Sequence, residues 1–85
     1  MTTTNRQAEI VEIQIRFLKR DKSLLRDDTP ESIRLLNDIL VDLRAGDVGA
    51  AVNSTERLMG FLAAVQTPVH RNFHIWAARL LESLA

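Results

Sequence analysis

The sequence contains no cysteine, which excludes disulfide frameworks and thiolate metal sites. A cysteine-free chain suits a reducing compartment, and we expect a cytoplasmic protein. The chain has only three glycines, and none of them lies in a phosphate-binding loop. No apolar run approaches the ~20 residues of a membrane span. The start of the chain, MTTTNRQAE, also lacks the apolar core of a signal peptide. We therefore expect no membrane partner.

Length and charge narrow the function classes further. A chain of 85 residues forms one domain, and we expect residues 1–85 to be a single helical domain with residues 1–4 frayed. Such a short chain buries only about 60–65% of its unfolded surface. Since 46% of the residues are hydrophobic, they suffice for a core and a subunit interface. Eleven basic and eleven acidic side chains cancel, which argues against a dedicated nucleic-acid binder.

The stretch from Asp47 to Gln66 is the centre of the predicted fold. Its apolar residues recur at steps of three and four, which is typical of a helix with one broad buried face. Asn53 and Arg57 fall on the opposite side. The face is formed by Val48, Val52, Thr55, Met59 and Leu62, with Ala51, Leu58 and Val65 beside them. We expect this helix to run over residues 47–66.

Start and stop signals delimit the helices on either side. Thr29-Pro30-Glu31 combines an N-cap residue, a proline at the first helical position and an acid near the positive end of the dipole, so a helix is predicted over 30–45. Gly46 then ends it, and Asp47 caps the next helix at once. So short a connection predicts a tight antiparallel hairpin. Thr67-Pro68 repeats the start signal and predicts a fourth helix over 68–84.

The first element fits two patterns. Apolar and polar residues alternate over 11–17 as in a strand, but residues 10–18 also carry two apolar stripes at helical spacing. We favour a helix over 5–20, extending to 26 if it does not end at Asp21, because a lone strand has no partner within the chain. The predicted fold is then an all-α, small four-helix bundle with a tight central helical hairpin. The two stripes are Ile10, Ile13 and Phe17, and Val11, Ile15 and Leu18.

Candidate chemistry is sparse. His70 and His74 lie four residues apart, so both imidazoles could face one metal ion, but Gln66 and Ala78 at the neighbouring turns offer no further ligand. We therefore interpret both histidines as ordinary polar positions. No Gly-rich elbow and no Ser-His-acid spacing is present. We expect no catalytic residue, metal, cofactor or small-molecule substrate.

Several apolar side chains point away from the predicted core face of their helices, and such residues together indicate a surface covered by a partner. We therefore predict a non-enzymatic protein–protein interaction module: a small regulator, inhibitor or adaptor that acts as a homodimer or docks on a protein partner. Charged side chains of the first element would set the orientation of binding. The predicted partner-binding residues are Val11, Ile15, Leu18, Val41, Phe61 and Ile75, with Arg16, Lys19 and Arg20.

The alternative is a small DNA-binding transcriptional regulator that uses the basic first element, residues 11–26. Up to Arg26 the chain has six basic and three acidic side chains, whereas Asp27 to Asp47 has six acidic and two basic ones. A basic element of this kind suits phosphate contacts. The same charges also suit the exposed end of a helix, where Lys and Arg favour the negative dipole.

Overall fold

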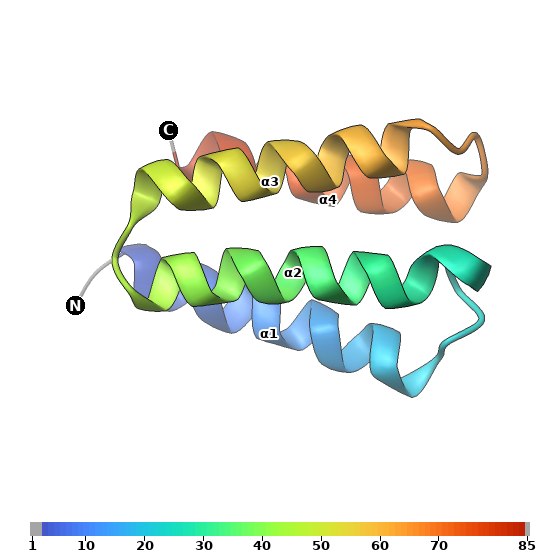
Figure 1. The fold of residues 1–85 in the computed structure, drawn as a ribbon, viewed down its shortest axis with the longest axis horizontal. Coiled ribbons are helices and arrows are strands. Elements are labelled where there is room, and N and C mark those ends of the chain that lie inside the picture. The colour runs from blue at the N-terminus through green and yellow to red at the C-terminus, as the bar shows by residue number, and fades with distance from the viewer. Residues whose placement is uncertain (1–2, 85) are drawn as a thin grey trace.

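The computed structural model describes residues 3–84, and it confirms the all-α four-helix bundle (Figure 1). No strand occurs within this described range, so the first element is a helix. The molecule measures 35 × 22 × 15 Å along its principal axes. Its elements are α1 (Thr3–Arg20), the short 3-10 helix η1 (Arg26–Asp28), α2 (Thr29–Arg44), α3 (Val48–Ala63) and α4 (Pro68–Leu84).

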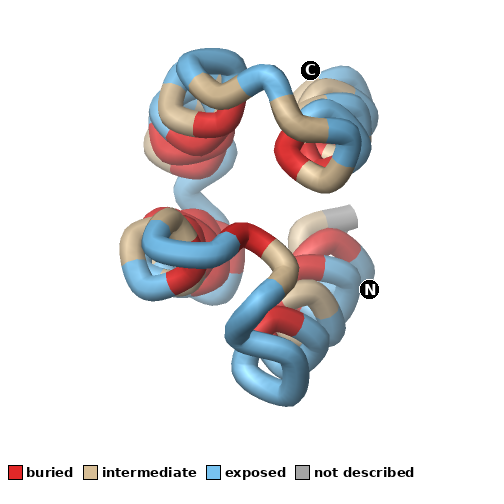
Figure 2. The backbone as a smooth tube through the Cα atoms, turned by 90° about the vertical axis from the view of Figure 1, so that its right-hand side faces the viewer, coloured by how far each residue is buried: buried red, intermediate tan, exposed pale blue. Residues whose placement is uncertain are grey.

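The helices follow one another around a square (Figure 2). α1 packs against α2, α2 against α3 and α3 against α4, whereas α1 and α4 are joined by far fewer close contacts. The connections alternate between the two ends of the bundle, so each helix runs antiparallel to the next (Figure 1). The bundle therefore has three closely packed sides and one looser side, between α1 and α4.

The predicted hairpin between α2 and α3 is confirmed. Gly46 adopts a φ of 75°, the left-handed conformation that glycine allows at the end of a helix. The Asp47 carboxylate accepts a hydrogen bond of 3.0 Å from the backbone N–H of Ala50, as an N-cap should. Two adjacent residues thus stop one helix and start the next.

Other boundaries differ from the predictions. α1 begins at Thr3 rather than near Asn5, so Thr3 and Thr4 are helical rather than frayed; residues 1 and 2 lie outside the described residues. α3 ends at Ala63 rather than Gln66. Thr29 does not cap α2: its buried hydroxyl donates to the Lys22 carbonyl at 2.9 Å. A tertiary hydrogen bond has replaced the expected local one.

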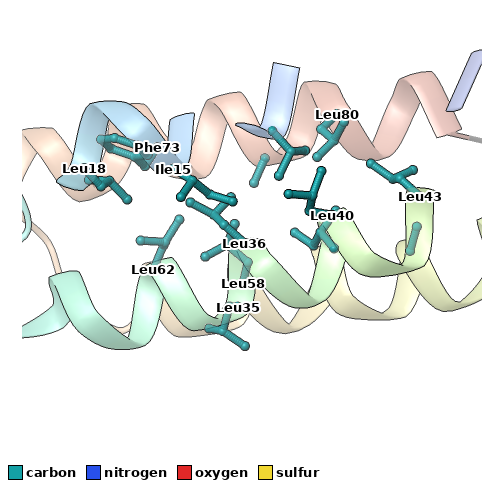
Figure 3. Close-up of a cluster of buried hydrophobic side chains, with 14 of the residues drawn as sticks. Ile15, Leu18, Leu35, Leu36, Leu40, Leu43, Leu58, Leu62, Phe73 and Leu80 are labelled. Atoms are coloured by element: carbon teal, nitrogen blue, oxygen red, sulfur yellow. The ribbon is translucent and has the colours of Figure 1, made fainter. Parts of the chain in front are cut away.

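The core lies along the axis of the bundle (Figure 3). Each helix contributes one apolar stripe, and burial of each leucine on it contributes about 1.5–3 kcal/mol. The inner face of α3 is confirmed at Thr55, Leu58 and Leu62, whereas Val48 at its start is exposed. The fully buried large side chains of the core are Val11, Leu18, Leu25, Leu36, Ile39, Leu43, Leu58 and Leu62.

Candidate functional site

The predicted partner-binding stripe of α1 is part of the core. Val11, Ile15 and Leu18 are 0%, 5% and 0% exposed, and Figure 3 shows Ile15 and Leu18 near Phe73. The prediction that these three side chains are left over from the core is therefore wrong. The physical reason is the rotation of α1 about its axis, which turns this stripe toward α2 and the bundle interior.

The other stripe of α1 is the exposed one. Ile10, Ile13 and Phe17 are 36%, 61% and 49% exposed, although apolar side chains of this size are usually buried. Their spacing of three and four residues places them in one line along the helix. The first element does carry more apolar surface than the core uses, but on the other stripe rather than on the predicted one.

The remaining apolar predictions are not brought together with this stripe. Val41 is 66% exposed and lines a shallow groove between α2 and α3. Ile75 is 46% exposed, and its position on α4 is two residues from the buried Phe73, on the outward side. Phe61 is half-buried and packs against the core. Each is thus an isolated feature.

The loose side of the bundle, which we call the α1–α4 seam, is defined by the exposed Ile10, Ile13 and Phe17 of α1 and the half-buried Trp76 of α4. The Phe17 ring stacks on Phe73 of α4 with centroids 6.5 Å apart and planes at 26°. Ile10 and Trp76 line a groove of about 250 Å³ between the two helices. Apolar side chains of α1 thus meet α4 at two places along the seam.

A hydrogen bond closes one end of this groove. The Gln7 side-chain amide donates to Ser83 Oγ at 2.6 Å, and Ser83 Oγ in turn donates to the Leu80 carbonyl at 2.6 Å. Gln7 is 7% exposed whereas Ser83 is exposed, so this contact is partly shielded from solvent. It joins the first turns of α1 to the last turn of α4.

Arginines line both hollows of the seam. Arg79 lines the groove beside Trp76, and Arg16 and Arg20 line a hollow of about 200 Å³ beside Ile13 and Phe17. No acidic side chain lines either cavity. Arg16 forms an ion pair with Glu12 at 3.1 Å, whereas Arg20 and Arg79 form none with any residue of the described chain. The seam combines apolar surface with a cationic border.

The third predicted cation, Lys19, lies elsewhere. It lines a different cavity, where α1 ends and α2 begins, together with Lys22 and Arg26. The predicted basic cluster of α1 is thus divided between two surfaces, because successive residues of a helix point in directions about 100° apart.

A buried histidine links α4 to the connection between α1 and α2. His70 is 2% exposed, and its Nε2 lies 2.9 Å from Asp28 Oδ2. Its Nδ1 lies 2.5 Å from the Thr67 hydroxyl, which accepts a further bond of 3.1 Å from the His70 backbone N–H. The Thr67 hydroxyl and the Asp28 carboxylate thus give each ring nitrogen of His70 a hydrogen-bond partner.

The series of a hydroxyl, an imidazole and a carboxylate resembles a hydrolytic triad only in composition. The Thr67 hydroxyl is already used as the cap of α4, and it lines none of the cavities identified among residues 3–84. A nucleophile needs room for a reacting atom and donors for an oxyanion. The arrangement therefore holds the structure together.

The prediction that His70 is an ordinary polar position is wrong. Its register, three residues before Phe73 and seven before Ala77, places it on the inner face of α4, and this signal was present in the sequence. His74 is half-buried. Within residues 3–84, no group of three His, Asp or Glu side chains is arranged to hold a metal ion.

Two further findings complete the description. None of the helices within the described range has both the length and the apolar character required to cross a membrane. Comparisons of the chain with protein-family models, with curated proteins and with solved structures give no match.

Proposed function

We propose that this protein is a non-enzymatic protein–protein interaction module, a small regulator, inhibitor or adaptor in the cytoplasm, and that the α1–α4 seam binds its partner. One observation carries the proposal: three large apolar side chains of α1 lie exposed in one line, and one of them, Ile10, lines a groove together with Trp76 of α4. Exposed apolar residues that gather in this way mark interaction sites, whereas scattered ones do not.

The form of the seam favours a helical partner. Two antiparallel helices with an apolar groove between them accept an amphipathic helix, whose anchors would lie at positions i, i+3 or i+4, and i+7. Phe17 stacks on Phe73 and lines a hollow with Ile13, and Trp76 lines the groove with Ile10. Aromatic side chains of this kind dominate the binding energy of many interfaces.

The border charges favour an acidic partner over a second copy of the chain. Arg20 and Arg79 lack acidic partners within the described residues, so Asp or Glu flanking the anchors of a bound helix would pair with them. A symmetric dimer of seams would bring both copies of these arginines into one interface. We therefore prefer an acidic amphipathic helix and treat the homodimer as an outcome of the test.

The sequence provides an intrinsic probe, because Trp76 is its only tryptophan. We would titrate the protein with a designed leucine-rich amphipathic peptide that carries glutamate on its flanks, and with the same peptide carrying lysine. We expect a saturable blue shift of Trp76 emission with the glutamate peptide and at least tenfold weaker binding of the lysine peptide. Equal binding of both, or no binding of either, would overturn the proposal.

Substitutions test whether the peptide binds at the seam. Ile13→Asp places a charge in the seam, which an apolar peptide face would have to bury, so it should abolish the emission shift. Because Ile13 is exposed, the substitution should leave the fold intact. The matched control is Val41→Asp, which places the same charge on an apolar side chain that is 66% exposed and lines the groove between α2 and α3, away from the seam. If both variants bind the glutamate peptide equally well, the seam is not the site.

Two other outcomes are informative. Sedimentation that shows a dimer lost on Ile13→Asp would assign the seam to a second copy of the chain. Binding of mixed-sequence duplex DNA that weakens steeply with salt, and is lost on Arg16→Gln with Arg20→Gln, would replace the proposal with the DNA-binding alternative.

A further inference from the structure

We propose that the cavity between the end of α1 and the start of α2 binds a small amphipathic anion: a carboxylate or phosphate monoester with a short apolar tail. The cavity measures about 680 Å³, larger than either hollow of the seam. Volumes of this order are usual for small-molecule sites. Its position on the α1–α2 connection separates it from the seam, so the two proposals stand independently.

The charges around the cavity favour an anion. Lys19, Lys22 and Arg26 line it, and none of these cations forms an ion pair with any residue described. Asp27 is the one acidic side chain among the lining residues. Three cations against one acid leave a local excess of positive charge, which a carboxylate or phosphate group would neutralise through charge-assisted hydrogen bonds.

The remaining wall of the cavity favours an apolar tail. Pro30 and Ile33, on the first two turns of α2, line the cavity together with the cations. Ile33 is half-buried and packs against the core, so the wall is a fixed apolar surface. A bare inorganic ion would leave this surface uncovered, whereas a tail of a few carbon atoms would remove it from water.

The connection that carries the cations is held in one conformation. The Asp21 carboxylate accepts hydrogen bonds from the Ser23 hydroxyl at 2.6 Å and from the Ser23 N–H at 3.2 Å. Leu25 is fully buried and anchors the middle of the segment. Arg26 has a φ of 54°, a conformation that side-chain-bearing residues rarely adopt.

A further bond fixes the two ends of the segment to each other. The Thr29 hydroxyl donates to the Lys22 carbonyl at 2.9 Å, which positions the backbone of Lys22 beside the start of α2. Lys22 and Arg26 therefore project from a segment that is already ordered. A ligand that binds there need not order the loop, so less of its binding energy is lost.

The test uses probes that distinguish the contribution of the anionic head group to binding from that of the apolar tail. We would follow the backbone amide resonances of the full chain while adding octanoate, octyl phosphate, octanol or acetate. We expect saturable shifts at Lys22, Arg26 and Ile33 with octanoate or octyl phosphate, and at least tenfold weaker effects of octanol and acetate. The comparison of octanoate with octyl phosphate decides which head group is preferred.

Substitutions test the cations directly. Lys19→Gln with Lys22→Gln removes two charges and leaves the unusual backbone of Arg26 untouched; octanoate binding should weaken at least tenfold. The matched control is Arg57→Gln with Arg71→Gln, which removes two exposed charges elsewhere on the molecule. Circular dichroism verifies that both variants fold.

Three results would overturn this inference: octanol binding as tightly as octanoate, equal weakening by the control variant, or shifts spread over the whole surface. The seam variant Ile13→Asp should bind octanoate like the unmodified chain. Loss of peptide binding and retention of octanoate binding in that variant would show that the two sites are separate.

Discussion

His70 Nε2 lies 2.9 Å from Asp28 Oδ2, and this hydrogen bond joins residues 42 positions apart in the sequence. It ties the first turn of α4 to the last residue of η1, so the two connections at that end of the bundle are held together (Figure 1). Because the imidazole is buried, the loss of its partner would leave a polar group without a hydrogen bond.

Asp28→Ala should lower the free energy of unfolding by about 1–3 kcal/mol, the usual cost of leaving a buried donor unpaired. The matched control is Asp27→Ala, since Asp27 is exposed and no hydrogen bond or ion pair of its side chain occurs within the described chain. Urea unfolding followed by circular dichroism measures both. Equal losses in the two variants would contradict a role for the His70–Asp28 bond.

The two stripes of α1 should respond differently to truncation. Leu18→Ala removes a fully buried side chain and should cost about 2–5 kcal/mol. Ile13→Ala alters a side chain that is 61% exposed and should change stability by only about 0.5 kcal/mol. Chemical unfolding of the two variants compares them, and a larger loss at Ile13 would mean that α1 is rotated differently.

Two glycines give opposite predictions. Gly46→Ala forces a side chain into the left-handed conformation at φ 75° and should destabilise the protein by about 1 kcal/mol. Gly60→Ala lies inside α3, where an added methyl group meets nothing within 4 Å, and should stabilise it by about 0.5–1 kcal/mol. Thermal unfolding distinguishes them, and stabilisation by Gly46→Ala would exclude this account of the hairpin.

Glu12 links α1 to α2 through Arg44, whose guanidinium lies 2.6 Å from its carboxylate. Hydrogen bonds from Arg44 and then Arg16 lower the pKa of Glu12 below its ordinary value. The folded-state pKa is thus below the unfolded one, so the associated stability is present above the unfolded pKa and is lost as pH falls through the folded pKa.

Arg44→Gln should therefore raise the pKa of Glu12, and by more than Arg16→Gln does, because the bond from Arg44 is the larger cause. Carboxyl ¹³C shifts recorded during an acid titration report this pKa directly. A greater rise with Arg16→Gln would show that the contact within α1 dominates over the contact between helices.

Ser32 contrasts with His70, because it is a buried polar residue whose side chain is not hydrogen-bonded within the described residues. It is 1% exposed, and its Oγ has no hydrogen-bond partner among the described residues. Ser32→Ala removes an unsatisfied hydroxyl with almost no change in volume and should raise the free energy of unfolding by about 1 kcal/mol. The exposed Ser23, whose hydroxyl is hydrogen-bonded to Asp21, is the comparison: Ser23→Ala should not stabilise.

Local signals in the sequence predicted much of the fold. The stop at Gly46 and the cap at Asp47 depend on backbone conformation and on one short hydrogen bond, so the residue types themselves specify the hairpin. Thr67 likewise caps α4 as its Thr-Pro signal predicts. Such features need no knowledge of the rest of the molecule.

The surface of α1 could not be predicted in the same way. Both of its stripes are made of large apolar residues, and the choice between them depends on contacts with other helices. In the observed rotation of the helix, Glu12 reaches Arg44 on α2 and Gln7 reaches Ser83 on α4. The pairing of His70 with Asp28 is equally non-local, although the spacing of His70 from Phe73 in the sequence already indicated that its side chain points inward.

The looser side of the bundle also determines how the fold comes apart. α2 and α3 each have two closely packed neighbours, whereas α1 and α4 each have one. Amide hydrogen exchange should therefore be slowest in the central hairpin and fastest in the two outer helices. Partial opening at this edge would uncover core leucines while the hairpin stays intact, and a helix bound along it would delay that first step of unfolding.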